Sequence, residues 1–246
     1  MICQETSIKH SKPIREYCYN PEEVPMTLQV GLVGTNGIVL ASDCLVGRSH
    51  VKHLTSKYSK ISTRKDQKVI SCWSGDEYPS TQLVKEVFKR LSGDDLSELS
   101  SNIPESILET SFGADIVKYD SAEAMAVTIS STPKLYEIRL RRDGTKGSVD
   151  RACVRIQDKC IMGHRANAAT FYTEHYYRKC PVENLVRLAA HTITTGSMIN
   201  PNGIGGLEII ICTERGFEHV PESRIDELLA WSHECDERVK GLIFSN

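Results

Sequence analysis

The segment 27–43 constrains the fold of this chain more than any other stretch. Two short apolar runs in it flank Asn36-Gly37, which is the strongest short-range signal for a tight hairpin turn between two β-strands. Thr27 stands where the first strand begins, and Asp43 follows the second. We therefore expect a β-hairpin with a hydroxyl at its start and a carboxylate at its end.

A basic cluster and a third strand follow this hairpin. Lys57 begins the cluster, and the strand 68–75 ends at Gly75. A hydroxyl, a carboxylate and an amine brought together can form a nucleophile site, because a nearby amine activates the hydroxyl while the carboxylate holds the lysine. The sequence therefore indicates Thr27, Asp43 and Lys57 as candidate catalytic residues.

The order of these features resembles the proteasome subunit family, within the N-terminal nucleophile hydrolases. Five motifs carry the resemblance: the 27–43 hairpin with Asp43 at the position of the family's aspartate, a Lys-x-x-x-Ile stretch at 57–61, the strand end Trp73-Ser74-Gly75, Gly163 in a strand-to-helix turn, and Gly205-Gly206 before a late strand. Their order and spacing, rather than any single motif, make the match fairly specific. The resemblance covers roughly Thr27 to the C-terminus.

The resemblance implies an α+β fold, a four-layer αββα sandwich of two antiparallel sheets flanked by helices. The blocks of strands and blocks of helices in the sequence favour the same arrangement independently. Residues 1–26 are then a leader or N-terminal arm, and residues 27–246 are a single domain of this kind. We expect the β type, since segment 1–26 shows no clear match to the N-terminal helix of the α-type subunits.

The resemblance also implies a role for each site residue. Thr27 would act only as the first residue of a mature chain, because its free α-amine titrates near pH 7.7–8.0 whereas a backbone amide is not a base. Lys57 would lower the pKa of the hydroxyl or shuttle its proton, and Asp43 would keep that lysine charged and aimed. The backbone N–H of Gly75 would stabilise the oxyanion. Each residue also has a structural alternative: a strand-opening threonine, a turn aspartate, a surface lysine and a strand-ending glycine.

Two further residues fall near the specificity-pocket positions of the family. These are Val46 and Trp73, which we expect to contact substrate. For Trp73, a place in the hydrophobic core is an equally good interpretation.

The chain departs from the active members of the family around the nucleophile. Met26 stands where they carry glycine, and Leu28 replaces their second hydroxyl residue. His164 replaces a serine, and segment 201–204 lacks their Asp and Ser. The polar groups that orient the nucleophile are therefore largely lost, and a site displaced by ~1 Å can lose on the order of 100-fold in rate.

Composition excludes several classes of function. The 246 residues carry a net charge of −2, so nothing points to nucleic acid or to an anionic membrane. No signal peptide or apolar run of ~18 residues is present, so no membrane segment is expected. The nine cysteines form no Cys-x-x-Cys pair, which favours reduced thiols in the cytoplasm or nucleus. No zinc-type ligand spacing supports a metal, and no cofactor is expected.

Three functions remain open from the sequence. The first is a threonine peptidase or amidohydrolase that cleaves peptide or amide bonds after removal of the leader. The second is a non-catalytic structural or assembly subunit of the same fold, and the third is a stand-alone amide hydrolase or acyltransferase on a small molecule. As partners we expect a peptide or amide substrate and further subunits in a homo- or hetero-oligomer, with a ring as one form.

The periodicity of apolar residues places the remaining elements. The predicted helices are 81–91, a polar helix between 94 and 112, 167–177, 182–195 and 225–239. The predicted strands are 124–129, 135–140, 152–156, 160–162, 207–212 and 217–220. In the strand 135–140, Glu137 and Arg139 are expected on a solvent-exposed face.

Overall fold

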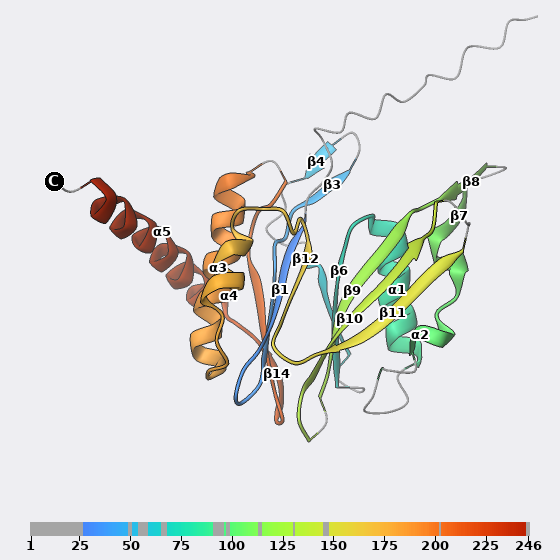
Figure 1. Ribbon diagram of the computed structural model, residues 1–246, viewed down its shortest axis with the longest axis horizontal. Helices are drawn as coiled ribbons and strands as arrows, with labels where there is room; N and C mark the ends of the chain where they lie inside the picture. Colours follow the sequence, from blue (N-terminus) through green and yellow to red (C-terminus); the bar gives the residue numbers. More distant parts are fainter. Residues whose placement is uncertain are drawn as a thin grey trace, which may run out of the picture.

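Two five-stranded antiparallel sheets form the centre of the molecule (Figure 1). The structure, a computed structural model, describes residues 27–48, 51–53, 59–64, 68–90, 96, 99–112, 115–129, 131–144, 148–201 and 203–244. The first sheet runs in the order β12 (Lys159–Gly163), β1 (Leu28–Val33), β2 (Ile38–Ser42), β13 (Glu208–Thr213) and β14 (Gly216–His219). The second runs in the order β11 (Val149–Ile156), β10 (Lys134–Arg142), β9 (Ser121–Thr128), β6 (Val69–Ser74) and β5 (Ile61–Arg64).

Helices and two small hairpins complete the described part of the chain. The helices are α1 (Glu77–Arg90), α2 (Leu99–Asn102), a 3-10 helix (Glu105–Leu108), α3 (Thr170–Tyr176), α4 (Val182–Ile199) and α5 (Glu222–Phe244). The hairpins are β3 (Val46–Arg48) with β4 (Val51–His53), and β7 (Glu109–Phe112) with β8 (Asp115–Lys118). None of the helices in the described ranges has the length and apolar character that crossing a bilayer requires.

The hairpin predicted from the Asn-Gly pair is confirmed. Strands β1 and β2 pair with Val33 opposite Ile38, and the N–H of Gly34 donates to the carbonyl of Gly37 at 2.7 Å. Gly37 packs so tightly that a Cβ there would lie 2.4 Å from the carbonyl oxygen of Cys212. The predicted late strand is confirmed in the same sheet, because β13 pairs with β2.

Successive residues of β1 face alternate sides of the sheet, and this alternation explains how the layers stack. Leu28 and Val30 face α4 in one hydrophobic cluster, while Gly31 points toward the second sheet. A Cβ on Gly31 would lie 2.9 Å from the Leu135 side chain, so a larger residue there would force the side chains of the second sheet to shift.

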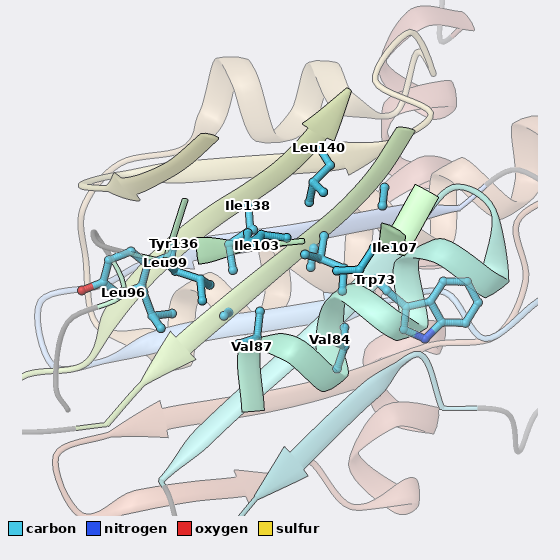
Figure 2. Packing of buried hydrophobic residues seen from close by; sticks show 14 of the residues in the cluster. Trp73, Val84, Val87, Leu96, Leu99, Ile103, Ile107, Tyr136, Ile138 and Leu140 are labelled. Carbon is cyan, nitrogen blue, oxygen red and sulfur yellow. The ribbon is translucent and has the colours of Figure 1, made fainter. Parts of the chain in front are cut away.

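Each sheet buries its other face against helices. The sheets share an inner cluster that includes Leu40, Ile70 and Met125. Figure 2 shows the cluster between the second sheet and α1, with Trp73 and Val87 among its members. The layers therefore follow in the order helices, sheet, sheet, helices (Figure 1), which is compatible with the expected sandwich.

Two predictions about secondary structure are wrong. The helix expected between 94 and 112 is interrupted: its described residues form short α2, the 3-10 helix and then β7. Pro104 explains the interruption, because proline disfavours helical geometry in the residue before it and lacks a backbone donor. Glu137 is only 8% exposed rather than on a solvated face, because Arg165, in the turn that follows β12 of the other sheet, pairs with it at 2.5 Å.

Candidate functional site

Backbone hydrogen bonds fix the position of Thr27. Its carbonyl oxygen accepts a bond from the N–H of His164 at 2.7 Å, and the next amide, Leu28 N–H, donates to Asp43 Oδ1 at 3.0 Å. Gly163, the last residue of β12, has φ +82° and lies directly against the Thr27 carbonyl. The nucleophile candidate is therefore held by main-chain contacts on both sides.

Asp43 is fully buried at the end of β2, and its carboxylate is fully hydrogen-bonded. Besides the amide of Leu28, the N–H of Leu45 donates to Oδ2 at 3.2 Å. Lys60 Nζ donates to both oxygens, at 3.0 Å to Oδ1 and 2.9 Å to Oδ2. A buried carboxylate needs such partners, since an unpaired buried charge is strongly destabilising.

The lysine of the candidate site is Lys60. Its side chain is 1% exposed, and Nζ lies 2.9 Å from Thr27 Oγ1 while contacting Asp43. The predicted lysine, Lys57, lies outside the described residues, so we assign the site lysine to Lys60 in its place. A signal in the sequence was available, because Lys60 directly precedes the buried residue Ile61 that opens β5.

The three contacts of Lys60 use the whole donor capacity of an ammonium group. An ammonium has three N–H donors and no acceptor, and two of them bond Asp43. The third bonds Thr27 Oγ1, so the threonine oxygen is the acceptor in this contact. The proton of the Thr27 hydroxyl is consequently directed to another acceptor.

Burial acts on both charges of the pair. It raises the pKa of Asp43, and the ion pair with Lys60 and the two backbone donors oppose that shift. Burial lowers the pKa of Lys60, and the charge of Asp43 opposes it. A lysine with a lowered pKa exchanges a proton with a neighbouring hydroxyl more readily than an exposed lysine does.

Gly75 directly follows β6 in an exposed position with φ +86°, a left-handed conformation that suits glycine. The side chain of Gln29 connects the end of β6 to the β1–β2 hairpin that carries Thr27. Its Nε2 donates to the Trp73 carbonyl at 2.7 Å and to Ser42 Oγ at 3.0 Å. Gln29 was not predicted from the sequence, although it is a polar residue within an otherwise apolar strand.

The two predicted substrate-binding residues differ in outcome. Trp73 is 4% exposed and packs in the cluster shared with α1 (Figure 2), so its side chain offers little surface to a substrate. The substrate-binding role predicted for it finds no support, and the core alternative explains it. Val46 begins β3 and pairs with His53, but its side chain lies outside what the structure describes.

A charged network that the sequence analysis missed flanks the end of β6. Arg165 Nη2 contacts Glu137 Oε1 at 2.5 Å and Glu123 Oε2 at 3.7 Å. Ser74, the residue before Gly75, donates to Glu123 at 3.5 Å. The network joins the turn after β12, which holds Thr27, to the strand end at Gly75.

The replaced polar positions have different structural roles. Ile204 is fully buried in the hydrophobic cluster under α4, and its side chain has no polar atom for a nucleophile site. His164 supports Thr27 through its backbone N–H. Within the described ranges, no group of three or more His, Cys, Asp or Glu side chains is placed to hold a metal ion.

Comparison of the chain with protein-family models and with curated proteins found no significant match. The functional argument therefore depends on the site itself: a hydroxyl, an ammonium and a carboxylate in a buried chain of contacts.

Proposed function

We propose that the chain is a proteasome-like member of the N-terminal nucleophile hydrolases, and that it cleaves peptide or amide bonds with Thr27 after removal of residues 1–26. The observation that carries this proposal is Lys60 Nζ, which lies within 3.0 Å of both Thr27 Oγ1 and the Asp43 carboxylate. The layer order and the position of Thr27 at the start of an inner strand support the Ntn-hydrolase fold.

Cleavage between Met26 and Thr27 creates the base that the chemistry needs. The freed α-amine takes the hydroxyl proton as Oγ1 attacks the substrate carbonyl carbon. The ammonium of Lys60 stabilises the developing negative charge on Oγ1, and the N–H of Gly75 stabilises the substrate oxyanion. The α-ammonium then protonates the leaving nitrogen, the C–N bond breaks, and water hydrolyses the ester left on Thr27.

A non-catalytic structural subunit is the second candidate. The buried side chain of Ile204 favours it, because the polar residues that orient the nucleophile in active relatives are replaced here by core packing. In that case Asp43 and Lys60 are a structural ion pair that accepts the Thr27 hydroxyl as one more partner.

The intact mass of the purified chain and hydrolysis of fluorogenic peptide amides test the proposal together. Wild type should lose residues 1–26 and hydrolyse the amides. Thr27→Ala should keep the leader and be inactive, whereas Thr27→Ser, which retains the hydroxyl, should keep measurable activity. Hydrolysis that persists in Thr27→Ala would refute the proposal.

A failure of maturation must be separated from a failure of chemistry. A chain whose Thr27 α-amine is exposed by an engineered protease site bypasses self-cleavage. If this chain folds, as circular dichroism and a cooperative melt would show, and still hydrolyses no peptide amide, the non-catalytic candidate is supported.

A further inference from the structure

A cavity lies at the end of the sandwich opposite to Thr27. Its volume is about 840 Å³, and its walls are the turns between β1 and β2, β9 and β10, β11 and β12, and β13 and β14. These turns lie at the lower edge of Figure 1. Thr27 precedes β1 and Val33 at its other end lines the cavity, so the two regions are roughly 20 Å apart at ~3.3 Å per residue.

The floor of this cavity is apolar. Val33, Ile156 and Phe217 line it and pack against the cluster between the two sheets. Leu135, another lining residue, is a fully buried member of that cluster. An apolar group that enters the cavity therefore reaches the hydrophobic interior of the sandwich.

The rim of the cavity is cationic. Arg155, Lys179 and Arg215 come from three different segments and are exposed, and the described residues provide none of these side chains with an ion-pair partner. The wall also contains one further cation, Lys134, and two carboxylates, Glu214 and Glu218. Positive charge thus predominates at the rim, although the whole chain has a net charge of −2.

We propose that this cavity binds a small organic phosphate of nucleotide size. The phosphates would contact Arg155, Lys179 and Arg215, since a guanidinium donates two parallel hydrogen bonds to a phosphate. A planar apolar ring would lie against Phe217 and Val33 on the floor. The volume falls within the ~300–1,000 Å³ of small-molecule sites.

The cations lie at the rim of the cavity and the apolar residues on its floor, and this arrangement favours an organic phosphate over other ligands. A free inorganic phosphate would leave the floor unfilled, and a fatty acid carries a single charge for a rim with several cations. An organic polyphosphate satisfies both surfaces.

Isothermal titration of the purified full-length chain with ATP as the probe tests this site. ATP should bind the wild type, and Arg155→Glu and Arg215→Glu should each weaken ATP binding by about 10-fold or more, because each substitution removes a charge-assisted hydrogen-bond donor and adds a repelling carboxylate. Arg155→Gln and Arg215→Gln should weaken it less. Glu218→Gln should strengthen it, because it removes a repelling carboxylate.

Matched controls separate the site from general charge effects. Arg238→Glu makes the same charge change at an exposed residue of α5, a helix that contributes no residue to the cavity walls, and should leave binding unchanged. Thr27→Ala should also bind ATP as the wild type does, so the result is independent of the proposed hydrolase function. Inorganic triphosphate should bind at least about 10-fold more weakly than ATP.

Four outcomes would overturn the proposal. They are no ATP binding at millimolar concentration, equal weakening in Arg238→Glu, triphosphate binding as tight as ATP, and octanoate binding tighter than ATP. The third would refute the apolar floor as a contact surface, and the fourth would refute the phosphate as the recognised group.

Discussion

Gly163 lies so close to Thr27 that a Cβ in place of its hydrogen would be 1.9 Å from the Thr27 carbonyl oxygen. No flexible side chain can relieve this contact, because the clashing atom belongs to the backbone. The end of β12 therefore determines where the nucleophile candidate stands. Its glycine is also required by φ +82°, which side-chain-bearing residues rarely adopt.

We predict that Gly163→Ala destabilises the protein by more than the ~1–2 kcal/mol that a left-handed conformation alone costs a non-glycine residue. Urea unfolding followed by circular dichroism measures the change in free energy. Gly144→Ala is the matched control, since a Cβ at Gly144 meets nothing within 4 Å and should change stability by less than ~0.5 kcal/mol. Equal stability of the two variants would contradict the close contact.

Lys60 rather than Lys57 should control catalysis. Lys60→Met removes the group that bonds Thr27 Oγ1 and should lower peptide-amide hydrolysis by ~100-fold or more, since removing one oxyanion-type donor typically costs 10²–10³. Lys57→Met should keep most of the activity. Rates for the two folded variants decide the assignment, and a larger loss in Lys57→Met would return it to Lys57.

The ion pair between Asp43 and Lys60 should show strong coupling in stability. Lys60→Met alone leaves a buried carboxylate without its counter-ion and should cost about 3–5 kcal/mol. The double variant Asp43→Asn/Lys60→Met should be less destabilised than the sum of the two single variants. Chemical denaturation of all four proteins gives the coupling energy, and simple additivity would mean that the pair contributes no specific interaction.

His191 should make stability depend on pH. Its Nδ1 lies 2.7 Å from Ser232 Oγ between α4 and α5, and burial lowers its pKa below 6.5, with Asp236 opposing the shift. As the pH falls, the His191 imidazole is therefore protonated in the unfolded chain before it is protonated in the folded protein. The stability contributed by neutral His191 is present above pH 6.5 and is lost as the pH falls below that value.

Thermal melts between pH 7.5 and pH 5 measure this dependence. His191→Asn should flatten the decrease of Tm at low pH, because the titrating group is absent. His233→Asn, which replaces an exposed histidine of α5, should retain the wild-type slope. A wild-type slope in His191→Asn would assign the pH dependence to other groups.

Local patterns in the sequence predicted the hairpin and two of the site residues. Thr27 and Asp43 stand at strand ends whose pairing follows from the Asn-Gly turn, so their proximity could be inferred. Adjacency to the strand-opening Ile61 favoured Lys60, but spacing alone did not exclude Lys57, because only the tertiary structure shows which lysine reaches Asp43. Glu137 was misplaced for a similar reason, since the residue that covers it, Arg165, lies in the turn that follows β12 of the other sheet.

The backbone bonds that hold Thr27 do not involve its side chain. His164 N–H binds its carbonyl, and Asp43 binds the following amide, so any residue at position 27 should be presented to Lys60 in the same place. The identity of the nucleophile candidate is therefore independent of the backbone contacts that position it. A cysteine at this position would place a thiol beside Lys60 on the same backbone. The side chain at the start of β1 can therefore be exchanged without a change in the surrounding structure.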